Sequence, residues 1–177
     1  MSLQIEPMNY WQDESIRWVM INTIAKSDDA PLSLNVSEDK SKQKFPKNPI
    51  LIKNIGENSF EISTGQFGLV VGGKNGVLIT KMQNNDAIIT DLMGEIEING
   101  KIYRTMTDSA KILSEGSLFA EIELTGKMRS SDDEIGRFVF RLSVMAGQPY
   151  IRIFWRIFND QAETLDISRF EFIGNCN

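Results

Sequence analysis

The chain has 177 residues, a length typical of one domain, and its net charge of −5 argues against nucleic acid, whose binding needs a dense cationic face. It contains no histidine and one cysteine, Cys176, which excludes serine–histidine and cysteine–histidine catalysis, internal disulfides and cysteine zinc sites. Chemistry based on carboxylates, lysine, arginine or tyrosine remains open.

The first residues carry no targeting signal that we recognise. They lack the basic and apolar regions of a signal peptide, and no apolar run along the chain approaches the roughly 20 residues that span a bilayer. The opening Met1-Ser2-Leu3 resembles a start added for expression, so we expect a tail over residues 1–9. No membrane partner is predicted, and localisation is left open.

Residues 15–25 form the first predicted strand. Their apolar side chains fall on both faces, with Ile16, Trp18 and Met20 on one side and Val19 and Ile21 on the other. A strand of this kind is typically central and covered on both sides. A short strand over 32–36 and a charged, mobile loop over 37–48 are predicted to follow.

Short alternating strands with turns between them fill the middle of the chain. We predict strands at 49–55, 59–64, 66–71, 77–82, 87–93, 95–98, 102–107, 110–113 and 118–125. The glycine-rich stretch 72–76 and the Asn99-Gly100 dipeptide predict hairpin turns. Helical spacing is rare, and segments 6–18 and 108–113 are predicted to hold one turn at most.

The C-terminal third predicts a hairpin of strands 137–145 and 150–158 around the turn 146–149. One face of this hairpin is uniformly apolar, which specifies its register. The predicted partners are Val144 with Ile151, Leu142 with Ile153, Phe140 with Trp155, and Phe138 with Ile157. A last strand over 165–172 is expected to contain a bulge, because the apolar parity shifts between Ile167 and Phe170.

These elements predict one all-β domain over residues 10–174, followed by a tail over 175–177. Turns recur every eight to twelve residues or so, which favours an antiparallel barrel or, alternatively, a β-sandwich. The barrel is expected to be incomplete, differently closed, or completed by another chain.

Arginines and aromatic residues alternate on the other face of the C-terminal hairpin. One interpretation is a solvated face where these arginines pair with glutamates of strand 118–125. The other is a shallow groove in which arginines bind the carboxylates of an acidic sugar and aromatic rings stack on it. The candidate carbohydrate contacts are Arg141, Arg152, Arg156, Tyr150 and Phe154, together with Trp11 near the N-terminus.

No catalytic residue, metal site or cofactor is predicted. Asp13 and Glu14 are adjacent, so in extended structure they point to opposite faces, and we interpret this region as a turn acid beside a buried tryptophan. The glycines between 65 and 76 lack the ending of a phosphate-binding loop. The acids Asp86, Asp91 and Glu95 do not have calcium-loop spacing.

Three stretches in this order resemble a known family. Residues 13–19 read Asp-Glu-Ser-Ile-Arg-Trp-Val after Trp11, residues 62–67 read Ile-Ser-Thr-Gly-Gln-Phe, and residues 146–152 read Ala-Gly-Gln-Pro-Tyr-Ile-Arg. Together they resemble the first domain of the exo-rhamnogalacturonan lyase-like proteins. Where that family has a glycine, this chain has Glu14, and only about ten residues precede the first motif, where family members have further strands.

The resemblance implies a small, closed β-barrel of the RIFT-related type that precedes a helical toroid and a further β domain. It also implies that the lyase chemistry lies outside this barrel. The expected partners are therefore C-terminal domains of the same polypeptide and an acidic polysaccharide.

The leading hypothesis is a non-catalytic domain of a pectin-degrading protein, which predicts an exposed apolar patch where the catalytic domain packs. A freestanding carbohydrate-binding module that uses the arginine–aromatic face is the main alternative. A small lyase with Tyr150 or Tyr103 as acid–base, and a barrel with an internal cavity for an apolar ligand, are two more.

Overall fold

The computed structural model describes residues 3–25, 46–161 and 163–176. This part of the chain is all-β, with antiparallel strand pairs throughout and no helix. The strands are β1 (Leu3–Tyr10), β2 (Ile16–Thr23), β3 (Leu51–Gly56), β4 (Ser59–Ser63), β5 (Gly68–Val71), β6 (Ile79–Gln83), β7 (Ile88–Ile98), β8 (Lys101–Glu115), β9 (Phe119–Arg129), β10 (Glu134–Met145), β11 (Ile151–Asn159) and β12 (Ile167–Cys176).

Strand β7 is the junction of the fold. Its first half, 88–92, pairs with β6, and its second half, 95–98, pairs with β8. Strand β12 pairs along nearly its whole length, so β6 and β8 share the opposite edge of β7. The ladder therefore divides at β7 into one layer that continues through β5 and β4 to β3, and another that continues through β9 and β10 to β11.

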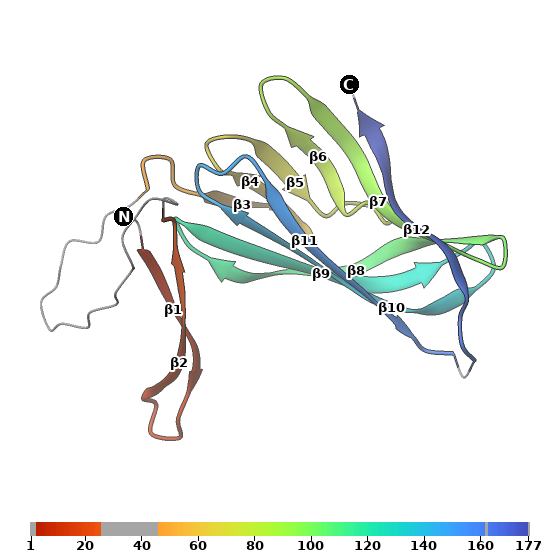
Figure 1. The fold of residues 1–177 in the computed structure, drawn as a ribbon, viewed down its shortest axis with the longest axis horizontal. Coiled ribbons are helices and arrows are strands. Elements are labelled where there is room, and N and C mark those ends of the chain that lie inside the picture. The colour runs from red at the N-terminus through yellow and green to blue at the C-terminus, as the bar shows by residue number, and fades with distance from the viewer. Residues whose placement is uncertain (1–2, 26–45, 162, 177) are drawn as a thin grey trace, which may run out of the picture.

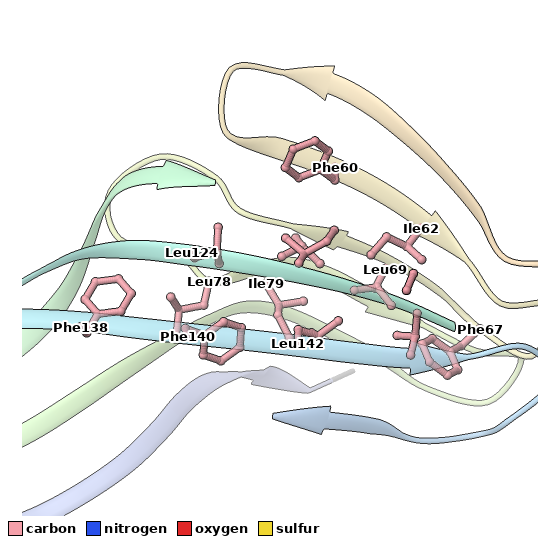
Figure 2. Packing of buried hydrophobic residues seen from close by; sticks show 14 of the residues in the cluster. Phe60, Ile62, Phe67, Leu69, Leu78, Ile79, Leu124, Phe138, Phe140 and Leu142 are labelled. Atoms are coloured by element: carbon pink, nitrogen blue, oxygen red, sulfur yellow. The ribbon is translucent and has the colours of Figure 1, made fainter. Parts of the chain in front are cut away.

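The core lies between these two layers. In Figure 2, Phe60, Ile62 and Leu69 approach from β4 and β5, while Phe138, Phe140 and Leu142 approach from β10. Apolar residues alternate along these strands, so every second side chain enters the core. Buried side chains thus fill the space between the layers, whereas a barrel for an apolar ligand would keep this space open.

The predicted C-terminal hairpin is confirmed residue by residue. Val144 pairs with Ile151 and Phe140 with Trp155, as the apolar face predicts. The expected irregularity in the last strand is confirmed as a register shift between Ile167 and Arg169. Asn99 and Gly100 both have positive φ, 51° and 76°, which is the backbone of the predicted tight turn.

Two pairs of predicted strands are each one continuous strand. The segments 87–93 and 95–98 merge into β7, and 102–107 and 110–113 merge into β8. Gly94 does not form a turn but stays in the strand, paired with Phe172 of β12, and the Trp155 ring packs where its side chain would lie. Asp108 and Ser109 lie beside a register shift of β8 rather than in a turn. The helical turns considered for 6–18 and 108–113 are absent, since the structure describes both segments fully and they are mainly strand.

The N-terminal predictions need the largest correction. Residues 3–10, expected to be a tail, form β1, and the C-terminal tail is also wrong because β12 extends to Cys176. Among the described strands, β2 pairs with β1 alone, so the expectation of a central strand covered on both sides is wrong. Figure 1 shows the β1–β2 hairpin projecting away from the two layers. The strand predicted at 32–36 and most of the loop at 37–48 lie outside the described residues.

The ladder of the described strands is open. Strand β3 pairs only with β4, and strand β11 pairs only with β10. Side chains nevertheless bridge the open side, because the Trp155 ring of β11 lies 4.4 Å from that of Phe170 and 4.8 Å from that of Phe172 on β12. The fold is thus an antiparallel two-layer structure with an incomplete closure between β11 and β12.

Candidate functional site

The outer face of β9, β10 and β11 carries four of the six candidate contact residues. Alternation along the strands points the core residues inward and Arg141, Arg152, Phe154 and Arg156 outward. Arg141 lies opposite Phe154 on one side and opposite Glu123 on the other. This surface is called the arginine–aromatic face below.

Part of this face is a network of ion pairs. The Arg141 guanidinium donates to Glu123 at 2.7 Å, and the Lys111 ammonium contacts the other carboxylate oxygen at 2.8 Å. Burial by itself raises the pKa of Glu123, but the hydrogen bonds from Lys111 and Arg141 outweigh it and hold that pKa below its ordinary value. Arg141 therefore already has a carboxylate partner within the protein, which it shares with Lys111.

Arg137, which neighbours these candidates, is also paired. Its guanidinium donates two hydrogen bonds to Asp160, at 2.9 Å and 3.0 Å. The hydrogen bond from Arg137 is the main reason that the pKa of Asp160 lies below its ordinary value. The predicted pairing with a glutamate of strand 118–125 is therefore found for Arg141, whereas Arg137 pairs with Asp160 instead.

Arg152 and Arg156 differ from these two. Among the carboxylates that the structure describes, none lies within ion-pair distance of either guanidinium. The Arg156 guanidinium instead lies 5.1 Å from the ring centre of Phe154 and 5.8 Å from that of Phe158. Four residues of extended strand separate the two arginines by about 13 Å. Strand β11 thus presents two cations without carboxylate partners, with aromatic rings between and beside them.

The two remaining candidates lie elsewhere. Tyr150 comes just before β11 and lines a pocket of about 300 Å³ with Phe67 and Met82. Trp11 lies at the tip of the β1–β2 hairpin, where the Arg17 guanidinium is 4.4 Å from its ring centre. The structure therefore does not unite the six candidates in one site.

The acids at this tip form a turn. The Asp13 carboxylate accepts hydrogen bonds from the Ser15 amide at 3.1 Å and the Ser15 hydroxyl at 2.6 Å, and the hydroxyl bond is the main cause of a lowered Asp13 pKa. Glu14 has a φ of 66°, the left-handed conformation that favours glycine. The turn acid is confirmed, but the buried tryptophan is wrong, because Trp11 and Trp18 are both exposed.

Tyr103 has a structural role. It is buried, and its hydroxyl donates to the Asp133 carboxylate at 2.9 Å. Burial first, and then this hydrogen bond, raise the pKa of Tyr103 above its ordinary value. Of the two tyrosines considered for a lyase, Tyr103 is thus buried and hydrogen-bonded within the protein, and Tyr150 is exposed.

The exposed hairpin is the feature that the sequence prediction missed. We call residues 3–23, with strands β1 and β2, the arm. Large apolar side chains cover it and are between 38% and 63% exposed: Ile5, Met8, Tyr10, Trp11, Ile16, Trp18, Val19 and Ile21. The apolar alternation in residues 3–5 indicates β1. It is a weak signal, because it covers only three residues and Pro7, a residue that argues against a strand, follows it.

A buried glutamine anchors the arm to the two layers. The Gln4 side-chain oxygen accepts from the Leu118 amide at 2.9 Å and the Phe119 amide at 2.8 Å, while its nitrogen donates to the Phe119 carbonyl at 2.9 Å. The same nitrogen contacts Glu6, whose carboxylate also accepts from Ser114 at 2.7 Å. Gly116 leaves the space for the Gln4 carboxamide.

The comparisons with known proteins leave the family open. No protein-family model matches the sequence, and no curated protein matches it significantly. In the described part of the chain, no group of three or more acidic, cysteine or histidine side chains is arranged to hold a metal ion. Among the same residues there is no helix that is long and apolar enough to cross a membrane.

Proposed function

We propose that this chain is a non-catalytic β domain of a larger polysaccharide-degrading protein of the rhamnogalacturonan or pectin type. In this proposal the arm packs against the catalytic domain of that protein, here called the parent protein. The observation that carries the proposal is the apolar arm, which matches the exposed patch expected for an accessory domain.

The size of the arm's apolar surface supports docking. Eight large side chains that are roughly half exposed present on the order of 700 Å² of apolar surface, taking about 150–200 Å² for each when fully exposed. The largest apolar patch of a typical monomer covers about 300–600 Å². A stable protein–protein interface buries about 800 Å² on each partner, so the arm alone supplies most of one side.

Both faces of the arm need a cover. Ile5 pairs with Ile21 on one face of the ribbon, whereas Trp18 and Met20 lie on the other face because alternate residues point to opposite sides. A two-stranded hairpin without further packing is marginally stable in water. The docking surface of the catalytic domain is therefore a cleft that contacts both faces of the arm, rather than a flat surface that contacts one.

The chemistry of the buried acids supports a non-catalytic role. Glu95 is buried and lies 3.0 Å from the Arg104 guanidinium and 2.8 Å from that of Arg169. Glu123 is held by two cations in the same way. General acid catalysis needs a carboxyl whose pKa is raised toward neutrality, whereas the hydrogen bonds from Lys111 and Arg141 hold the pKa of Glu123 below its ordinary value.

The substitution Trp18→Ser, made in the isolated chain and in the parent protein, tests this proposal. Trp18 is 63% exposed in the isolated chain, so the change is expected to alter the free energy of unfolding there by less than about 0.5 kcal/mol. In the parent protein the docked ring is buried, and the expected loss is about 2 kcal/mol. Leu51→Ser is the matched control, because Leu51 is equally exposed but lies on β3.

A destabilisation by Trp18→Ser that is equally small in both proteins would contradict docking of the arm. The catalytic part of the proposal has its own readout. The parent protein is expected to cleave rhamnogalacturonan, seen as the ultraviolet absorbance of an unsaturated product, and the isolated chain is expected to show none. Cleavage by the isolated chain would contradict the non-catalytic assignment.

A second candidate function is the binding of an acidic polysaccharide by the arginine–aromatic face. The two arginines of β11 without carboxylate partners favour it, since such cations can bind uronate carboxylates. Calorimetry with oligogalacturonides is expected to give heat that the Arg152→Gln, Arg156→Gln double variant reduces at least tenfold. Arg137→Gln is the control, because Asp160 already neutralises that arginine. Titration without heat would exclude this function and leave the docking proposal intact.

A further inference from the structure

A polar groove lies on the outer face of β4, β5 and β6 and has the features of a ligand-binding site. It encloses about 390 Å³ and lies on the opposite side of these strands from the core. Its polar side chains include Glu61, Ser63, Gln66, Lys81, Gln83 and Asn85. None of the six sequence-based candidates lines it, and it lies apart from the arm and from the arginine–aromatic face.

Gly68 makes the hollow. Across the three strands, Gly68 of β5 lies between Ser63 of β4 and Gln83 of β6. The neighbouring row has Val70 between Glu61 and Lys81, where a side chain fills the corresponding position. The missing side chain at Gly68 therefore leaves a depression whose rim is polar.

The protein itself gives no reason for a glycine at this position. Gly68 does not have a left-handed backbone, and a Cβ placed there would meet nothing closer than the Ile62 carbonyl oxygen at 3.9 Å. At Gly72 and Gly126, by contrast, a Cβ would lie 2.0 Å from a backbone oxygen. A glycine inside a strand weakens it, and it often marks the close approach of a ligand.

The turns at the end of the groove are held by internal hydrogen bonds. The Thr64 hydroxyl oxygen accepts from the Gln66 and Phe67 amides, at 3.4 Å and 3.3 Å. The Asn84 side-chain oxygen accepts from the Asp86 amide at 2.9 Å and the Ala87 amide at 2.8 Å. Both turns are thus held in place before a ligand binds, which lowers the entropy cost of binding.

The free groups of the groove suit hydroxyl groups. A carboxamide is both donor and acceptor, as is a sugar hydroxyl, and the side chains of Gln66, Gln83 and Asn85 make no hydrogen bond to another described residue. Glu61 and Lys81 form no ion pair within the described chain, and their charges cancel. The groove is therefore matched to an uncharged, polyhydroxylated ligand rather than to an anion.

A separate apolar pocket lies on the core side of these strands, since core-packed Met82 and Ile151 line it together with Tyr150. It meets the groove at the strand ends, where both contain Phe67 and Asn84. We propose that the groove itself binds neutral pyranose units, with the sugar hydroxyl groups on the carboxamides of Gln66, Gln83 and Asn85.

Nuclear magnetic resonance of the ¹⁵N-labelled chain tests this site. Methyl glycosides of glucose, galactose, mannose and rhamnose, and the corresponding disaccharides, are titrated separately. At least one of these sugars is expected to shift the side-chain amide signals of Gln66, Gln83 and Asn85 in a saturable way. Galacturonic acid is expected to leave these signals unshifted. Larger shifts with disaccharides would identify an internal chain segment as the ligand, and equal shifts would identify a chain end.

Gly68→Val is the decisive variant. The valine side chain occupies the hollow without touching the core, so sugar binding is expected to fall at least tenfold while the melting temperature stays equal or rises. Gly56→Val is the matched control, since Gly56 also has open space and no left-handed backbone. If Gly68→Val does not fold, the Gln83→Ala, Asn85→Ala double variant replaces it.

The proposal is overturned if no neutral sugar shifts these signals, or if a folded Gly68→Val chain binds as tightly as the wild type. It is independent of the proposed docking function. Trp18→Ser is expected to leave sugar binding unchanged, so loss of docking and loss of sugar binding are separable results.

Discussion

Truncation of the arm's anchor, Gln4→Ala, is expected to release the arm while the two layers stay folded. In the wild type, the amides of Leu118 and Phe119 both donate to the Gln4 side-chain oxygen, and the Phe119 carbonyl accepts from its nitrogen. The substitution removes all of these partners at once. Because Gln4 is buried, the packing of its methylene groups is lost as well.

The cost follows from these contacts. Each buried hydrogen bond that is lost costs about 1 kcal/mol, and water that enters as the arm lifts limits the penalty of unpaired groups. We therefore expect the contact between the arm and the two layers to weaken by about 3 kcal/mol. This change raises the equilibrium constant for opening of the arm about a hundredfold. Gln4→Met fills the same space without hydrogen bonds, so it separates polar contacts from packing and is expected to recover only a part of this loss.

Amide hydrogen exchange measures the effect directly. The Leu118 and Phe119 amides are expected to exchange about a hundred times faster in Gln4→Ala, with core amides of β10 unchanged. Gln12→Ala, an exposed glutamine at the arm's tip, is the control and is expected to change nothing. Unchanged exchange at Leu118 and Phe119 would refute the anchoring role of Gln4, and faster exchange throughout β10 would refute the idea that the arm opens alone.

Two further substitutions test local features. Glu14→Gly is expected to stabilise the arm by about 1 kcal/mol, because Glu14 has a left-handed φ of 66° that glycine adopts without strain. Amide exchange in β1 and β2 measures this effect and is expected to be slower in the variant. Gln12→Gly is the control. Glu123→Gln is expected to lower the free energy of unfolding by about 1–2 kcal/mol at neutral pH, since it removes contacts to Lys111 and Arg141. The folded-state pKa of Glu123 lies below its ordinary value of 4.5, so its contribution is present above that pH and lost as the pH falls through the lower folded value. Urea unfolding between neutral pH and pH 3 is therefore expected to show a shallower acid loss in Glu123→Gln than in wild type, and parallel curves would contradict the assignment.

Much of the C-terminal fold is predictable from sequence. The hairpin of β10 and β11 has one uniformly apolar face, and a slip of one residue would expose Phe138 and Phe140, so its register is specified locally. The lengths of β7 and β8 are not predictable in this way. Gly94 and Asp108 resemble turn residues, and only the pairing of β7 with β12 and of β8 with β9 shows that the strands continue.

The arm shows a different limit. Apolar residues on both faces of β2 predict a strand that is covered on both sides. The sequence does not tell whether the cover comes from this chain or from another domain. Alone, the chain leaves Trp18 and Ile21 exposed. The prediction that β2 is covered on both sides is wrong for the isolated chain, and the proposal that the arm docks on another domain is based on it.

The candidate site was predictable in part. Alternation placed Arg141 and the glutamates of β9 on one face, and the pair with Glu123 follows from the register. The lack of a partner for Arg152 and Arg156 was not predictable, because it depends on β11 having no hydrogen-bonded neighbour beyond β10 among the described strands. The groove was missed because its residues come from three strands and two turns, and only Gly68 in the middle of a strand signals it.

Hydrogen–deuterium exchange of the arm, compared between the isolated chain and the parent protein, tests the central claim most directly. Peptides that cover β1 and β2 are expected to exchange rapidly in the isolated chain, because this two-stranded ribbon is exposed on both faces. In the parent protein the same peptides are expected to be protected at least tenfold, with β10 equal in both. Equal, rapid exchange of the arm in the two proteins would contradict a docked arm.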